Sequence, residues 1–201
     1  MFKHLKAVFL LIALLSVVGY FANCTTSVEP SPMPGILTIT LQSNPQDTLI
    51  VIIRDTLIVG PEDYFGAVIF QGRVFSDKNY AFLFNEKDNP RQEDKTYNII
   101  ERIDHEYTKY KIFESYVPPG SYDRIQFGIK GDLVKLSYFD IPVKMPEGES
   151  PTQTLEADFN VEENKRTEIT VQISPFESVA RYKDSYLFRP VLEITDVTYS
   201  N

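Results

Sequence analysis

Apolar and polar residues alternate along much of the chain after residue 34, and the alternation is clearest in its C-terminal half. In segment 153–162, leucine, alanine, phenylalanine and valine alternate with acidic or amide residues, and segment 167–174 alternates in the same way. This period of two is typical of a strand with one buried face and one solvated face. The polar residues 162–166 between the two segments are typical of a turn, so we predict that the segments form a hairpin.

Further short segments carry the same strand signals, and no window of ten or more residues shows a helical stripe. Many short strands separated by turn residues predict an all-β fold, a single antiparallel β-sandwich. The other candidate strands are 35–41, 65–75, 80–84, 96–103, 107–114, 122–129, 133–141 and 190–197.

One pentapeptide, DTLIV, occurs twice, at 47–51 and at 55–59. The offset of eight residues is even, so in one continuous strand both copies would show the same face. Alternatively, a turn at Arg54 and Asp55 allows the two copies to pair as a hairpin. Because the segment is strongly β-prone and apolar, an edge position would invite pairing with other chains. We therefore expect it to be central and buried.

The N-terminal segment has the pattern of a secretory signal. Lys3 and Lys6 precede an uncharged apolar run of sixteen residues, 7–22. A transmembrane helix needs about 20 apolar residues, so we predict a signal peptide over 1–23 rather than a permanent span.

Cys24, the only cysteine, follows this run directly. A secreted chain with one cysteine cannot form an internal disulfide, so the residue needs another explanation. The sequence Phe21-Ala22-Asn23-Cys24 resembles a bacterial lipobox, although the family prefers Leu at the first position and Gly or Ala before the cysteine. We predict that Cys24 is acylated and that the lipid bilayer is a partner of the protein; the alternative is a stray thiol beside an ordinary cleavage site.

Residues 24–34 are proline-rich and predict an extended tether, followed by the β-sandwich domain over 35–201. Removal of residues 1–23 takes two of the 20 basic residues and none of the 28 acidic ones, so the net charge becomes −10. This charge argues against nucleic acid as a partner.

The candidate chemistry of the chain is sparse. His105, between Asp104 and Glu106, resembles a general base held by a carboxylate, but a solvated loop or hairpin turn explains it better. One His and one terminal Cys cannot supply the usual zinc ligands, and neither a G-x-S-x-G elbow nor a phosphate-binding glycine loop occurs. We therefore predict a non-enzymatic protein without catalytic, cofactor or metal sites.

The acidic loop over 85–95 is a candidate calcium site, but it lacks the spacing of a calcium-binding loop, so we interpret it as solvated. Its carboxylates are Glu86, Asp88, Glu93 and Asp94.

Tyrosine and phenylalanine are abundant, and most are expected to fill the core. Two tyrosine pairs are candidates for an exposed aromatic patch that binds a glycan or a protein partner. They are Tyr107 with Tyr110, and Tyr182 with Tyr186.

The segment 114–132 contains a Pro-Pro-Gly-Ser-Tyr turn that runs into an alternating strand. Pro118 and Pro119 stiffen the turn, Gly120 permits a positive φ, and Tyr122 can place its hydroxyl on a backbone partner. With the later segments 139–146, 159–173 and 186–194, this order resembles the family of bacterial secreted lipoproteins known as DUF4382. The turn alone is also similar to that of transthyretin-like and Cna-B-type sandwiches.

The resemblance covers about two thirds of the chain, and residues 60–112 depart from it. It implies a β-sandwich of immunoglobulin- or transthyretin-like type and an envelope location, but no activity. We predict a membrane-anchored envelope lipoprotein with a binding or structural role. The outer membrane is favoured because Thr25 replaces the aspartate that retains enteric lipoproteins in the inner membrane. The alternatives are a glycan-binding accessory module, an adhesin or pilus-type subunit that pairs through an edge strand, and last a hydrolase.

Overall fold

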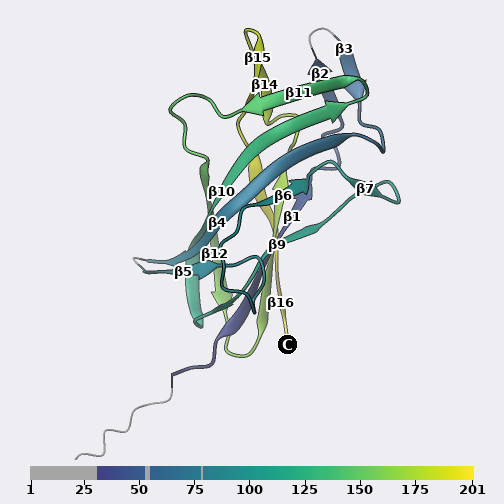
Figure 1. Cartoon of the computed structure of the whole chain (residues 1–201). Helices are drawn as coiled ribbons and strands as arrows, with labels where there is room; N and C mark the ends of the chain where they lie inside the picture. The colour runs from purple at the N-terminus through teal and green to yellow at the C-terminus, as the bar shows by residue number, and fades with distance from the viewer. Residues whose placement is uncertain (1–30, 53–54, 78) are drawn as a thin grey trace, which may run out of the picture. The chain divides into compact units, whose positions relative to one another are not determined.

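The computed structural model describes residues 31–52, 55–77 and 79–201. The predicted signal peptide, Cys24 and most of the predicted tether lie outside the described residues. Within the described ranges the chain is all-β, with sixteen strands arranged in four sheets (Figure 1). This part of the chain contains no helix that is long and apolar enough to cross a membrane.

The first large sheet has four strands in the order β16-β13-β1-β9. Strand β1 lies at its centre because it pairs in parallel with β13 and antiparallel with β9. The strands are β1 (Gly35–Ser43), β9 (Tyr110–Val117), β13 (Arg166–Ile173) and β16 (Leu192–Ser200).

The second large sheet has eight strands, and the seventeen-residue strand β10 (Gly120–Leu136) organises it. One edge of β10 pairs with β4, and the other pairs first with β12 and then with β11. The remaining strands are β4 (Tyr64–Ser76), β5 (Asn79–Leu83), β6 (Lys95–Asn98), β11 (Phe139–Lys144), β12 (Thr152–Val161), β14 (Val179–Tyr182) and β15 (Ser185–Phe188).

Two small hairpins complete the described fold. Strands β2 (Leu49–Ile52) and β3 (Asp55–Ile58) pair with each other, and so do β7 (Arg102–Ile103) and β8 (Glu106–Tyr107).

One hydrophobic core lies between the inner faces of the two large sheets. Alternate residues of each strand supply it, for example Leu37, Ile39 and Leu41 of β1, which are almost fully buried. Phe113 of the first sheet and Phe127 of the second place their ring centroids 6.1 Å apart. The predicted all-β sandwich is therefore confirmed. Two of its pairings, β1 with β13 and β11 with β15, are parallel rather than antiparallel.

The predicted hairpin of segments 153–162 and 167–174 is wrong. These segments become β12 and β13, which belong to different sheets, and the chain crosses the sandwich between them. Both strands do alternate as predicted, because each has one face on the core. Alternation reports which face is buried, and it does not report which strand is the neighbour.

The two DTLIV copies pair as a hairpin, which was one of the two predicted arrangements. In the antiparallel register of β2 and β3, Leu49 lies opposite Ile58 and Ile50 lies opposite Leu57. The expectation that this segment is central and buried is wrong, because the hairpin is a separate two-stranded sheet with one exposed face.

The proline-rich turn before β10 has the predicted geometry. Gly120 has a φ of +156°, and the Tyr122 hydroxyl donates a hydrogen bond of 2.6 Å to the carbonyl oxygen of Pro118. The Tyr122 ring stacks on Phe159 of β12 with a centroid separation of 5.6 Å. These contacts fix the start of β10 against its neighbour.

Candidate functional site

The first predicted tyrosine pair is not exposed. Tyr107 is only 6% exposed, and its hydroxyl accepts a hydrogen bond from Arg102 and donates one to the carbonyl oxygen of Asp47. Tyr110 is half-buried, and its hydroxyl donates to the carbonyl oxygen of Asn98. Burial raises the pKa of both phenols above their ordinary value of 10.0. Both tyrosines therefore anchor neighbouring loops.

The second pair lies on the β14–β15 hairpin, where the two rings belong to opposite faces. Tyr182 pairs with Ser185 and Tyr186 pairs with Arg181, which are adjacent positions of the ladder. Successive positions of a strand point to opposite faces. Tyr182 is 55% exposed, whereas Tyr186 is partly buried against the core. The four predicted tyrosines therefore do not form one shared surface.

His105 lies at the tip of the β7–β8 hairpin, in the turn that was predicted. Asp104 and His105 have φ values of 53° and 71°, and both side chains are exposed. A two-residue turn with both φ values positive matches the twist of the two flanking strands. His105 and Arg102 line two shallow depressions, of about 410 and 380 Å³, one on each side of the hairpin.

The acidic loop does not form a metal site in the described part of the chain. No group of three or more His, Cys, Asp or Glu side chains there is placed to hold a metal ion. Two of the loop carboxylates lie near basic side chains instead: Glu93 lies 3.9 Å from Arg91, and Asp94 lies 4.0 Å from Lys130.

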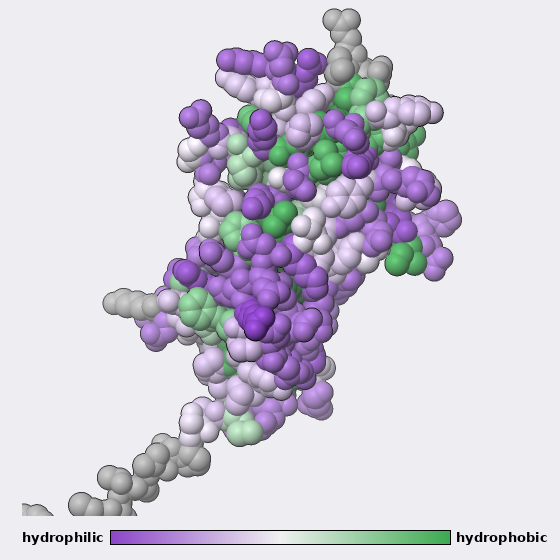
Figure 2. Space-filling view, in the orientation of Figure 1, coloured by the Kyte–Doolittle hydropathy of each residue, from purple (hydrophilic) through white to green (hydrophobic). Residues whose placement is uncertain are grey.

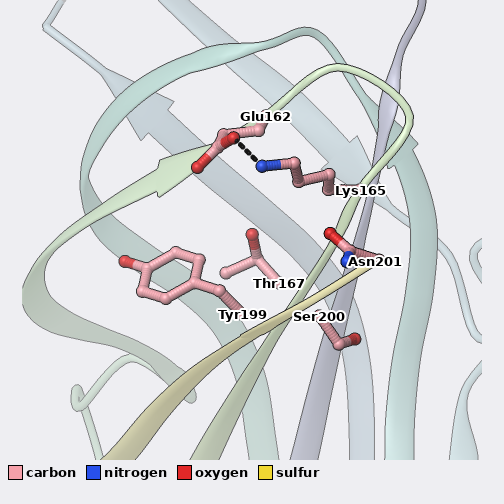
Figure 3. A pocket seen from close by; sticks show the side chains of 6 residues that line it. All are labelled: Glu162, Lys165, Thr167, Tyr199, Ser200 and Asn201. Carbon is pink, nitrogen blue, oxygen red and sulfur yellow. Dashed lines mark hydrogen bonds and ion pairs between the residues drawn. The ribbon is translucent and has the colours of Figure 1, made fainter.

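A further depression, of about 220 Å³, lies beside the end of β16 (Figure 3). An ion pair of 2.5 Å between Glu162 and Lys165 borders it, and Thr167, Tyr199, Ser200 and Asn201 complete its lining. Polar groups at this depression are already paired: the Thr167 hydroxyl donates a hydrogen bond of 2.9 Å to the carbonyl oxygen of Asn160, and the Glu162 carboxylate is bound by Lys165.

A group of exposed and half-exposed aromatic side chains lies on the outer face of β4, β5 and β10. We call this group the aromatic surface, and its members are Arg73, Phe75, Tyr80, Phe82 and Arg124. The strand register assembles it, because Phe75 lies opposite both Tyr80 and Arg124, and Arg73 lies opposite Phe82. The intervening residues Val74, Ala81 and Leu83 point toward the core, as the strand period requires.

The members of the aromatic surface contact one another closely. The Tyr80 and Phe82 rings meet edge to face, with centroids 5.3 Å apart. The Arg73 guanidinium lies 5.2 Å from the Tyr80 ring centroid and 5.6 Å from that of Phe82, and Arg124 lies 4.8 Å from Phe75. Each such cation–π contact contributes about 0.5–1 kcal/mol at an exposed site. These contacts hold the rings in place while Tyr80 stays 50% and Phe82 43% exposed.

Polar side chains extend the same sheet face toward β12. Gln126 lies opposite Arg73 and also opposite Thr154, to whose hydroxyl its amide donates a hydrogen bond of 3.2 Å. Glu156 lies opposite Arg124. From β5 to β12 the face spans three strand spacings, about 14 Å. The result is a sheet face with rings at one side and hydrogen-bonding groups at the other.

The sequence contained a signal for this surface. In segment 80–84, Tyr80 and Phe82 occupy alternate positions and must share a face. Apolar residues occupy both faces of that segment, so the sequence alone does not identify which face is buried.

Comparisons of the chain with protein-family models, with curated proteins and with solved structures give no match. The resemblance to the DUF4382 lipoproteins therefore stays a prediction.

Proposed function

We propose that this chain is a non-enzymatic, membrane-anchored protein of the bacterial cell envelope, whose β-sandwich binds carbohydrate through the aromatic surface. The observation that carries the proposal is the pair of half-exposed rings, Tyr80 and Phe82, in edge-to-face contact on one sheet face. The anchor is supported by the signal-like segment 1–23 and by the position of Cys24.

The chemistry of the aromatic surface suits a sugar chain. The negative face of an aromatic ring attracts the positively polarised C–H groups of a sugar ring. The guanidinium groups of Arg73 and Arg124 carry several donors each, of which one on Arg124 is bound to the carbonyl oxygen of Asp77 at 3.0 Å, and the amide oxygen of Gln126 is an acceptor. Such groups match the paired hydroxyls of a saccharide. The outer face of a sheet suits an extended polymer better than a small molecule, because small-molecule sites are concave.

Binding to carbohydrate is tested by native electrophoresis of the full-length protein, in detergent, through gels containing a soluble polysaccharide. A neutral β-glucan and a polyuronate serve as the two probes. We expect retardation by at least one of them, and about tenfold weaker binding in Tyr80→Ala and in Phe82→Ala, since one stacked ring contributes about 1–3 kcal/mol.

The matched control is Tyr182→Ala, which removes an equally exposed tyrosine from the β14–β15 hairpin. It should bind like the wild-type protein. Equal retardation of Tyr80→Ala and wild type, or no retardation in either gel, would contradict the carbohydrate proposal.

The anchor is tested separately, by the intact mass of the protein extracted from the membranes of its own cells. We expect the mass of residues 24–201 plus acyl chains, and its loss in Cys24→Ala. An unmodified soluble product would refute the anchor without affecting the carbohydrate proposal.

A further inference from the structure

The β2–β3 hairpin exposes three aliphatic side chains. Leu49, Val51 and Ile58 are 54%, 60% and 76% exposed. Leu49 lies directly opposite Ile58, and Val51 lies opposite the exposed Thr56, so the four side chains share one face. Figure 2 shows hydrophobic side chains gathered over β2 and β3, at the top of the view.

The opposite face of the hairpin is buried against the sandwich. Ile50 and Ile52 are 5% and 2% exposed, and Leu57 packs partly against the core. A sequence that is apolar on both faces of a strand is typical of strands that are buried on both sides. In this hairpin only one of the two faces is covered by the chain itself.

The hairpin also has free edges. Among the described residues, no third strand pairs with either β2 or β3. In an antiparallel ladder, alternate residues of each strand direct their backbone N–H and C=O groups away from the partner strand. An isolated two-stranded hairpin is marginally stable in water, and such an edge is a template for a further strand.

We propose that this hairpin is a self-association surface, on which β3 of one copy pairs with β2 of the next copy. The two strands carry the same pentapeptide, and the chain already pairs one copy of it with the other, with Leu49 opposite Ile58 and Ile50 opposite Leu57. Pairing between chains in this register repeats the same apolar pairs. It also uses the outward backbone groups, because residues that face away from each other within a hairpin are the ones that meet between hairpins.

The charge of the chain also favours a second copy as the partner of this hairpin. The chain has a net charge of −8, so two copies repel each other over most of their surfaces. The exposed face of the hairpin consists of Leu49, Val51, Thr56 and Ile58, which are all uncharged. It is therefore a place where two copies approach with little electrostatic cost. Because the contact joins different strands of the two copies, it is heterologous, and it extends beyond a dimer unless the copies close into a ring.

The test is size-exclusion chromatography with light scattering on the full-length protein in detergent, over a concentration series. We expect oligomers that grow with concentration. Ile58→Lys and Val51→Lys place a charge on the pairing hairpin, and each should weaken association by about tenfold or more. Because both side chains are more than half exposed, these variants should keep the wild-type melting temperature.

The matched control is Ile103→Lys, which adds the same charge to an exposed isoleucine, 62% exposed, on the β7–β8 hairpin. It should associate like the wild type. A second measurement, amide hydrogen exchange of residues 49–58, should show protection that increases with protein concentration. A monomer at every concentration, or equal losses in Ile58→Lys and Ile103→Lys, would overturn the proposal. This test is independent of carbohydrate binding.

Discussion

Glu114 allows a sharp test of how the outer face of the first sheet contributes to stability. Its side chain is 8% exposed, and its carboxylate accepts a hydrogen bond of 2.9 Å from Arg166 and contacts the ammonium group of Lys111. Arg166 also donates to the hydroxyl of Thr38, 2.8 Å away. The contact with Lys111, followed by that with Arg166, holds the pKa of Glu114 below its ordinary value of 4.5, although burial opposes this shift.

The change Glu114→Gln removes the charge and keeps the shape. A hydrogen bond to a charged group contributes about 1.5–3 kcal/mol, whereas the amide oxygen of glutamine retains part of the contact with Arg166. The half-exposed Lys111 adds less than about 1 kcal/mol. We therefore expect a loss of about 1–2 kcal/mol at pH 7. For a domain of this size, that is a decrease in melting temperature of about 2–8 °C.

The lowered pKa of Glu114 also fixes how its contribution to stability changes with pH. Because the pKa is lowered in the folded state, the stabilisation is fully present above the unfolded pKa, near 4.5, and is lost as the pH falls through the folded pKa. Thermal unfolding followed by circular dichroism between pH 7 and pH 3 should show the two curves converging below pH 4.5. Glu168→Gln is the control. The Glu168 side chain is 35% exposed, and its ion pair with Lys109, at 3.2 Å, should contribute less than about 1 kcal/mol. Equal losses in the two variants, or parallel curves down to pH 3, would refute this reasoning.

Three further predictions concern packing and buried polar groups. Tyr122→Phe leaves the carbonyl oxygen of Pro118 without its donor and should cost about 1–2 kcal/mol in urea unfolding. Gly128→Ala places a Cβ atom 2.4 Å from the Phe70 ring and should cost about 1–3 kcal/mol, part of which Phe70→Leu should restore. Asp47→Ala removes the acceptor of two backbone N–H groups and should cost about 1–3 kcal/mol, whereas Asp47→Asn retains an acceptor oxygen and should cost less.

Each of these has a result that contradicts it. For the tyrosine, Tyr182→Phe is the exposed control, and an equal effect of both changes would show that the buried hydroxyl is not the cause. For the glycine, additive losses in the double variant would mean that the Phe70 ring is not the obstacle. For Asp47, burial raises the pKa of the carboxyl despite the two backbone donors. Its contribution to stability therefore decreases as the pH rises above its ordinary value of 3.8, and Asp47→Asn should remove that slope.

Most strands were predictable from the sequence, but their ends and their neighbours were not. The candidate strands 96–103 and 133–141 each contain a turn, which separates β6 from β7 and β10 from β11. The alternation of Leu155, Phe159 and Ile169 records only that each points toward a core. The chain pairs Ile36 with Arg166 in parallel, and no local pattern encodes a contact over such a separation. The turn before β10 was predictable because its contact is local: Tyr122 bonds to Pro118, four residues earlier.

The candidate site shows the same limit. Tyr107 and Tyr110 lie close together in the sequence, yet Tyr107 is buried, and its hydroxyl donates to the carbonyl oxygen of Asp47, sixty residues away. The aromatic surface depends on the register of β4 with β5 and β10, which sets Phe75 beside Tyr80 and Arg124. Such a register depends on long-range pairing, and composition does not contain it.

Strand β1 lies between the chain segment that follows the proposed anchor and the self-association hairpin. Where the chain enters the sandwich, the backbone of Met33 donates to Glu163 over 2.7 Å, and that of Ile36 donates to the carbonyl oxygen of Lys165 over 2.9 Å. These contacts hold the start of β1 against the β12–β13 turn. Strand β1 then runs for nine residues, about 30 Å, before the chain turns into β2 (Figure 1). The proposed anchor precedes one end of β1 in the chain and the self-association hairpin follows the other end, so the two proposals concern opposite ends of this strand.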